Sequence, residues 1–192
     1  MAKRNEFKPD KPRSGFLSKL YLTRLQRRGL LKWVLYALVL VGLSVVQDVI
    51  LCRISVFGAT TDLVPAAIFL ICILEGLQRG SVFSLIASVA YLFSESSLGP
   101  YTIVIITALS VLTAFFRQSY LQAGFSAAAL CTAGATLLYE LATFCMGLFL
   151  SLTTPARIGV FVLTAALSVG VILLLYPAFK AIGRIGGQQW KE

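Results

Sequence analysis

The 192-residue sequence contains no histidine and few charged residues. Imidazole is the commonest metal ligand and general base at neutral pH, so its absence excludes haem ligation, histidine-bound zinc and Ser-His catalysis in this chain. Only 13% of the residues are charged, whereas an ordinary soluble domain has about 25%. The polar residues are too few to cover a water-facing surface, and the composition therefore predicts an integral membrane protein.

The four cysteines are scattered, and no two of them form a CxxC pair. Cys72, Cys131 and Cys145 lie in apolar runs, where cysteine usually behaves as a small buried hydrophobic residue, and Cys52 lies near the end of such a run. We therefore expect no disulfide, no metal site and no cofactor. Six spans of about 20 residues and one tail would nearly fill the chain, which leaves no room for a soluble catalytic domain. A function as an enzyme is not expected.

Apolar residues make up 58% of the chain and fall into runs. The predicted fold is an all-α membrane protein, a bundle of about six transmembrane helices with cytoplasmic N and C termini. We expect a basic cytoplasmic tail with an amphipathic juxtamembrane helix over 1–31, a polytopic transmembrane domain over 32–180 and a short cytoplasmic tail over 181–192. The predicted spans are 33–51, 62–77, 80–93, 98–116, a fifth within about 122–148, and 158–179.

The second and third runs, of about 16 and 14 residues, are shorter than the roughly 20 residues that cross a bilayer. Two interpretations follow. The second helix begins earlier, near Ile54, and is kinked at Pro65, or the two runs form a re-entrant hairpin.

The net charge of +9 is concentrated at one end of the chain. Residues 1–32 hold ten of the 17 Lys and Arg residues against two acidic ones, and the rest of the chain is nearly neutral. Cytoplasmic flanks of membrane proteins accumulate Lys and Arg. With six crossings, 15 basic residues lie on the cytoplasmic side and only Arg53 and Arg157 lie outside. If the second and third runs form a re-entrant hairpin, Arg79 alone changes from the cytoplasmic to the outer side. The charge therefore predicts an orientation and not a nucleic-acid site.

From Ser14, apolar and basic residues alternate with the period of an amphipathic helix. A basic helix immediately before a span would lie in the cytoplasmic headgroups and attract anionic lipid, with Arg24, Arg27 and Arg28 as the candidate contacts. It would act as a determinant of orientation, or as a docking site for a cytoplasmic partner.

Ionisable residues inside a membrane are functional candidates, because burial of a charge is costly unless the charge is paired or reaches water. Glu75 and Arg79 are four residues apart and are expected to form an ion pair near the inner turn. The depth of Glu140 depends on the fifth helix. If that helix is centred near Leu138, the carboxylate is mid-membrane and needs a donor from another helix; if it starts near Tyr120, Glu140 lies near the exit.

Two further acidic residues lie at expected span ends. Asp48 is close to Arg53 at the end of the first run. Both side chains can reach the membrane interface from there by snorkelling, which explains their presence without a functional role. Glu95 lies in a polar turn and is expected to be solvated.

Small residues recur every four positions in the fifth run, at Gly124, Ala128 and Thr132. In the third run they recur every three or four positions, at Ser81, Ser84 and Ser88. In lipid, such residues mark faces where helices approach closely. The faces would serve packing within the chain or the binding of a partner helix.

From about Val34 to Ala181 the order of spans resembles the MreD family of the bacterial cell-elongation machinery. The motifs are Asp62-Leu63 opening the second span, Arg79-Gly80 in a tight inner turn, and Leu98-Gly99 opening the fourth. Where that family usually has an acidic residue, about eight positions before the Leu-Gly turn, this sequence has Tyr91. The resemblance implies a non-catalytic scaffold in the bacterial inner membrane that maintains rod shape by binding an MreC-like bitopic protein and other elongation proteins.

Two other functions fit the residues. One is the substrate-binding membrane subunit of an energy-coupling-factor vitamin transporter, which would enclose a pocket near the outer face. The polar segments at Thr60 to Asp62 and Ser94 to Ser97 could line it. The other is a proton-coupled carrier that uses Glu140, although no internal repeat supports it.

Overall fold

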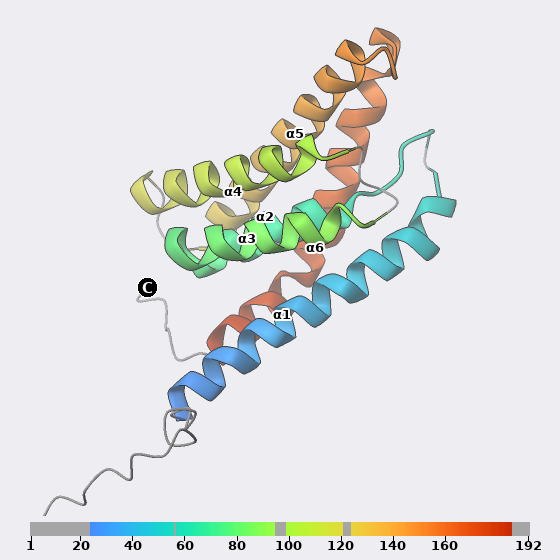
Figure 1. Ribbon diagram of the computed structural model, residues 1–192. Helices are drawn as coiled ribbons and strands as arrows, with labels where there is room; N and C mark the ends of the chain where they lie inside the picture. Colours follow the sequence, from blue (N-terminus) through green and yellow to red (C-terminus); the bar gives the residue numbers. More distant parts are fainter. Residues whose placement is uncertain (1–23, 56, 95–98, 121–123, 186–192) are drawn as a thin grey trace, which may run out of the picture.

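The computed structural model in Figure 1 describes residues 24–55, 57–94, 99–120 and 124–185. These residues form six α-helices, two short 3-10 helices and no β-strand, which confirms the all-helical expectation. The elements are α1 (Arg24–Val49), η2 (Leu51–Arg53), α2 (Leu63–Glu75), α3 (Leu77–Tyr91), α4 (Tyr101–Tyr120), α5 (Phe125–Phe149), η3 (Pro155–Arg157) and α6 (Ile158–Arg184).

Four helical segments are long and apolar enough to cross a membrane: 27–53, 101–119, 125–149 and 155–184. They coincide within a few residues with the first, fourth, fifth and sixth predicted spans. Helices α2 and α3, with 13 and 15 residues, fall short of the roughly 20 residues that a lipid-exposed span needs. The described part of the chain is therefore a helical bundle of membrane character with two short members.

Helix α2 lies at the centre of the bundle. All its residues from Leu63 to Leu74 are buried, and it packs against each of the other five helices. A helix that is apolar on every side is typical of one surrounded by protein. Because its neighbours cover it, α2 does not itself have to match the thickness of the lipid.

An earlier start of this helix near Ile54 is wrong. The described residues between Ile54 and Asp62 are not helical, and Phe57 and Gly58 adopt positive φ angles of 53° and 82°. Pro65 lies in the first turn of α2, where the missing N–H removes no intrahelical hydrogen bond, and so it does not kink the helix.

Helices α2 and α3 form a hairpin alongside α1. Gln47 of α1 contacts the start of α2, and Lys32 of α1 contacts its last residue, Glu75. The stretch from Lys32 to Gln47 is about 22 Å long at roughly 1.5 Å per residue. Helix α3 then returns until Ser94, just beyond it, reaches Asp48. The hairpin therefore extends alongside the central part of α1, from Lys32 to Gln47.

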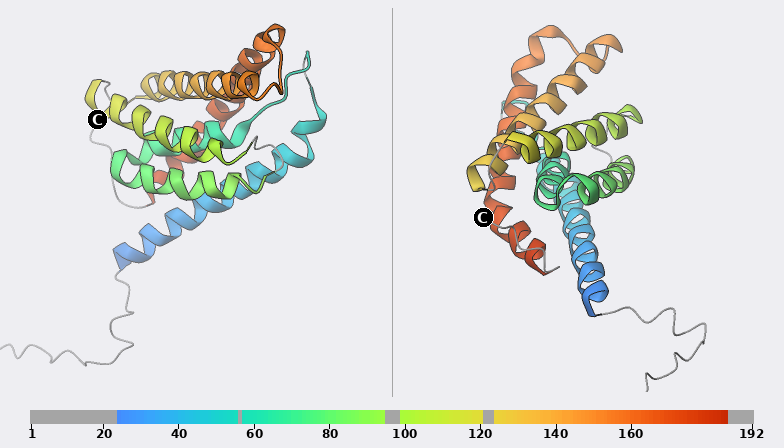
Figure 2. Two further views of the ribbon diagram at one scale, coloured as in Figure 1. Left: turned by 45° about the horizontal axis from the view of Figure 1, so that its top comes forward. Right: turned by 90° about the vertical axis from the view of Figure 1, so that its left-hand side faces the viewer.

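Helices α5 and α6 form a second hairpin that turns at η3. It rises at the top of Figure 1, and α6 descends from there past α2 to the N-terminal half of α1. Both views in Figure 2 show the C-terminal end of α6 on the same side of the bundle as the N-terminal end of α1. A contact of Tyr36 with the carbonyl oxygen of Phe179 joins the two helices there.

The faces of small residues pack inside the chain. Ala128 and Thr132 of α5 are buried, and so are Ser84 and Ser88 of α3. The Ser88 and Thr107 hydroxyls lie 3.2 Å apart across the α3–α4 contact. Gly124, at the N-terminal cap of α5, is exposed.

Gly80 lies where α3 approaches α2 most closely. A Cβ atom at Gly80 would lie 2.7 Å from both the carbonyl oxygen and the Sγ atom of Cys72. A backbone oxygen cannot move aside as a flexible side chain can. The close approach of the two helices therefore requires glycine at this position.

We predict that Gly80→Ala lowers the free energy of unfolding by about 1 to 3 kcal/mol, the usual cost of overpacking. Unfolding of the purified protein by sodium dodecyl sulfate in mixed micelles, followed by circular dichroism, measures it. Gly42→Ala is the matched control, because a Cβ at Gly42 meets no atom within 4 Å. Equal stability of the two variants would contradict the close approach.

Candidate functional site

Polar side chains from other helices hold both ends of α2. We call the group at its N-terminal end, Gln47, Asp62, Tyr91 and Ser168, the Asp62 cluster. The group at its C-terminal end, Lys32, Tyr36 and Glu75, is the Glu75 cluster. In an apolar bundle, a polar group without a partner costs free energy, and so these contacts fix the position of α2.

In the Asp62 cluster, each carboxylate oxygen of Asp62 accepts a hydrogen bond. The Nε2 atom of Gln47 donates to Oδ1 at 2.9 Å, and the Tyr91 hydroxyl donates to Oδ2 at 2.8 Å. The backbone N–H of Asp62 donates to the Ser168 hydroxyl oxygen at 2.8 Å. Asp62 thus links α1, α3 and α6 at the start of α2.

The same Gln47 side chain caps α2. Its Oε1 atom accepts hydrogen bonds from the backbone N–H groups of Leu63 at 2.7 Å and Val64 at 3.1 Å. The first N–H groups of a helix have no partner within the helix, so a side chain must supply one. Here the cap comes from α1, since the Asp62 side chain at the N-cap position makes no such bond.

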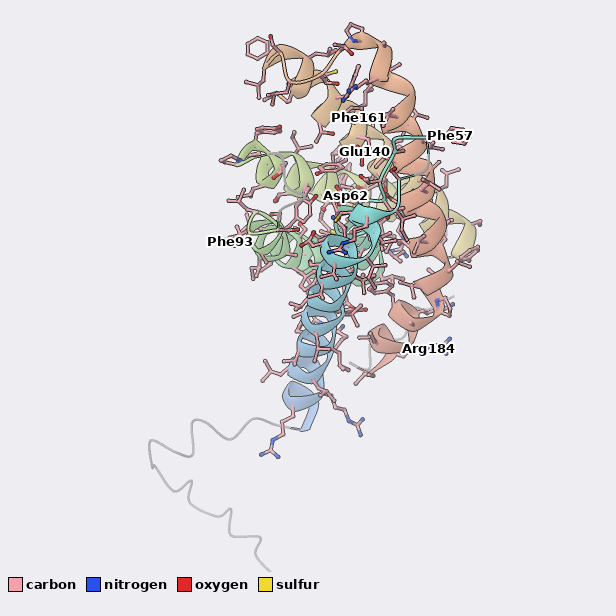
Figure 3. The ribbon with its side chains drawn as sticks, turned by 90° about the vertical axis from the view of Figure 1, so that its right-hand side faces the viewer. Phe57, Asp62, Phe93, Glu140, Phe161 and Arg184 are labelled. Carbon is pink, nitrogen blue, oxygen red and sulfur yellow. The ribbon has the colours of Figure 1, made fainter. Side chains whose placement is uncertain are left out.

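Glu140 projects from α5 toward the Asp62 cluster (Figure 3). Only 6% of Glu140 is exposed, and its Oε1 atom has no hydrogen-bond partner among the described residues. Helix α5 spans 125–149, and so Glu140 lies near its middle. This agrees with the first of the two expected positions of the fifth helix.

In the Glu75 cluster, the Lys32 ammonium lies 2.5 Å from Oε2 of Glu75. The two side chains are 2% and 4% exposed. The Tyr36 hydroxyl lies 3.0 Å from Oε1 of Glu75 and 3.3 Å from the carbonyl oxygen of Phe179. This buried ion pair thus joins α1, α2 and α6.

The C-terminal end of α2 has a second contact, from α4. The guanidinium of Arg117, which is 8% exposed, donates to the carbonyl oxygen of Ile73. The last carbonyl groups of a helix lack partners within it, and a basic side chain there is favourable.

The expected ion pair of Glu75 with Arg79 is wrong. Helix α2 ends at Glu75, and Gly76, with a φ of 83°, turns the chain into α3. The two residues therefore do not share one continuous helix, and Glu75 pairs with Lys32 instead. Arg79 is exposed on the first turn of α3.

The other candidate residues belong to neither cluster, although Asp48 follows Gln47 in α1 and interacts electrostatically with Asp62. The Asp48 carboxylate accepts hydrogen bonds from the Ser94 hydroxyl, at 2.9 and 2.8 Å. Arg27 and Arg28 are exposed in the first turns of α1. Arg24 is the first residue of α1, and its side chain, like Glu95 and the predicted amphipathic residues of 14–23, lies outside the described part. All four cysteines are free.

A comparison of the chain with models of protein families, with curated proteins and with solved structures finds no match. Arguments about function therefore depend on the residues and their geometry.

The residues that hold α2 carried weak signals in the sequence. Gln47 interrupts an apolar run, and a lone amide at that depth indicates a specific acceptor or donor. Lys32 and Tyr36 are four residues apart and therefore share one face at the start of the first run. The pattern indicated these faces but not their partners, because Asp62 is 15 residues from Gln47 and Glu75 is 43 residues from Lys32.

Proposed function

We propose that this protein is a non-catalytic integral membrane scaffold of the bacterial cell-elongation complex. It maintains rod shape by binding an MreC-like bitopic protein and other membrane proteins of lateral peptidoglycan synthesis. Its location is the bacterial inner membrane.

The observation that carries the proposal is the place of the motif residues that resemble MreD. Asp62 and Leu63 open α2 and receive the contacts from α1, α3 and α6. Gly80 allows the close approach of α3 to α2, and Gly99, with a φ of 147°, precedes α4. Asp62-Leu63 and Gly80 thus lie where helices meet, and there each residue type has a physical reason. The expected place of Arg79-Gly80 in a tight turn is wrong, because the chain turns at Gly76 and both residues lie in the first turn of α3.

The proposed orientation places both termini in the cytoplasm. The C-terminal end of α6 lies beside the N-terminal half of α1, so the two ends of the bundle share one side. The basic residues are concentrated at these ends of the chain, as the cytoplasmic side requires. On this arrangement Arg27 and Arg28 reach anionic headgroups.

Large exposed faces are available for partner helices. Along α1, the face that carries Val34, Leu38, Val41 and Val45 is exposed for most of its length. Within a bilayer such a face contacts lipid or another transmembrane helix. Membrane complexes assemble when a well-packed partner helix replaces the lipid on such a face. We propose that the bitopic partner packs here.

Depletion of the protein in its native bacterium tests the function. We predict that rods lose their shape, become round and lyse, because lateral wall synthesis loses its membrane scaffold. Phase-contrast microscopy measures cell width, and a copy of the wild-type gene restores it. Gly134→Ala on α5, which adds a methyl group where no atom lies within 4 Å and which lies away from the exposed face of α1, is the control variant and also restores it.

Normal rods after depletion would overturn the proposal. If such rods required an external vitamin, the result would instead favour the substrate-binding subunit of an energy-coupling-factor transporter.

A further inference from the structure

Two carboxylates approach each other inside the bundle. Asp62 precedes α2, Glu140 lies on α5, and the two helices pack together. The two groups interact electrostatically. Figure 3 shows both in the same part of the bundle, away from Arg184 at the end of α6.

Neither carboxylate has a basic partner. Among the residues that the structure describes, no lysine or arginine forms an ion pair with Asp62 or Glu140. Lys32 is bound to Glu75 and Arg117 to Ile73, both at the other end of α2. Two acidic groups in one poorly solvated site therefore have no basic side chain of the described residues bound to them.

Several buried oxygen atoms in the same part of the bundle have no hydrogen-bond partner within the described part of the chain. Glu140 Oε1 and the hydroxyl oxygens of Thr61 and Tyr101 are buried and have no hydrogen-bond partner among the described residues. Tyr139 interacts electrostatically with Asp62, Glu140 and Tyr101, which places these groups in one neighbourhood. Buried polar atoms in native proteins are nearly always satisfied, so several unsatisfied ones together indicate a missing ligand.

We propose that Asp62 and Glu140 form a binding site for a singly charged cation, either Na⁺ or the ammonium group of a small amine. Asp62 is already oriented by Gln47 and Tyr91, and Glu140 supplies the free oxygen. A cation between the two carboxyl groups supplies a positive charge that no basic side chain of the described ranges provides there, and it uses oxygen atoms that otherwise lack a partner. This site is independent of the proposed role in cell elongation.

The donor set favours a monovalent cation. No group of three or more His, Cys, Asp or Glu side chains that could hold a metal ion occurs in the described ranges. Zn²⁺ takes nitrogen and sulfur ligands, and Ca²⁺ takes six to eight oxygens with several carboxylates. Two carboxylates and neutral hydroxyls suit a singly charged ion or an ammonium group, which hydrogen-bonds to carboxylates and stacks on aromatic rings.

The full-length protein in nanodiscs tests the site. Thermal unfolding is followed in choline chloride while NaCl, or methylammonium chloride, replaces it at constant ionic strength. A ligand that binds only the folded state raises the unfolding temperature with its concentration. We expect one of the two cations to do so, and isothermal titration calorimetry of the wild-type protein to detect the same binding directly.

Glu140→Gln keeps the size of the side chain and removes the charge, and we expect it to weaken binding at least about tenfold. Glu6→Gln makes the same chemical change in the polar N-terminal segment of the sequence and serves as the control, with binding unchanged. Stabilisation by Na⁺ identifies the ion, and stabilisation by methylammonium identifies an amine. The proposal is overturned if neither cation binds the wild-type protein, or if Glu140→Gln binds as tightly as Glu6→Gln. Neither result depends on cell shape.

Discussion

Replacement of Lys32 by methionine is expected to lower the free energy of unfolding by about 3 to 5 kcal/mol. The Lys32 ammonium and the Glu75 carboxylate are 2.5 Å apart and almost wholly buried. Removal of one member of a buried pair leaves the other charge without compensation, which is far more costly than the pair itself is favourable. Methionine keeps the length of the side chain, so the loss of charge is the main change.

The partner variants make this expectation specific. Glu75→Gln alone should also destabilise, because it leaves the Lys32 ammonium buried among apolar groups. The double variant of Lys32→Met and Glu75→Gln should recover much of the loss, since no buried charge remains. Unfolding in mixed micelles gives the four free energies and their coupling. If the losses of unfolding free energy in the two single variants simply added up in the double variant, Lys32 and Glu75 would not interact, which would contradict the ion pair in the structure.

Gln47→Met should destabilise the bundle by about 2 to 4 kcal/mol. Methionine has a similar volume but cannot accept from the N–H groups of Leu63 and Val64 or donate to Asp62. Each buried group that loses its partner costs about 1 to 3 kcal/mol, and partners found in the unfolded chain within the membrane offset part of this. The same micelle titration measures the difference.

Gln47→Glu separates the two roles of this side chain. Glutamate still accepts from the two N–H groups at the start of α2, but it can no longer donate to Asp62 and brings a negative charge beside that carboxylate. An unfolding free energy equal to that of the wild type would show that the contact with Asp62 contributes nothing. Full stability of Gln47→Met would contradict the capping role altogether.

Four long helices were predictable from the sequence because each carries an apolar run of sufficient length with few charged residues. Helix α2 was predictable as an apolar segment but not in its extent. Its start depends on Phe57 and Gly58, which adopt positive φ angles, and on a cap that Gln47 supplies from another helix. Local patterns contain no information about such distant contacts.

The candidate sites show the same limit. The place of Glu140 within its helix followed from the extent of α5, which is centred near Leu138 and does not begin near Tyr120. The depth of Glu140 in a membrane stays a prediction. The partner of Glu75 was wrong because sequence proximity favoured Arg79, whereas the fold brings Lys32 across 43 positions. Tyr91, noted only as a departure from a motif, donates to Asp62. Pairing between helices is decided by packing, which periodicity does not specify.

The complete enclosure of α2 has a consequence for how the chain is made. When α2 and α3 leave the ribosome, only α1 precedes them, and α4, α5 and α6 have not been synthesised. A hairpin of 13- and 15-residue helices is then shorter than the lipid around it, and the bilayer must thin or the helices must tilt to accommodate it. Synthesis of α4, α5 and α6 replaces the lipid around α2 with protein and relieves the mismatch of that helix. The insertion of α2 is therefore completed only after α4, α5 and α6 have been synthesised.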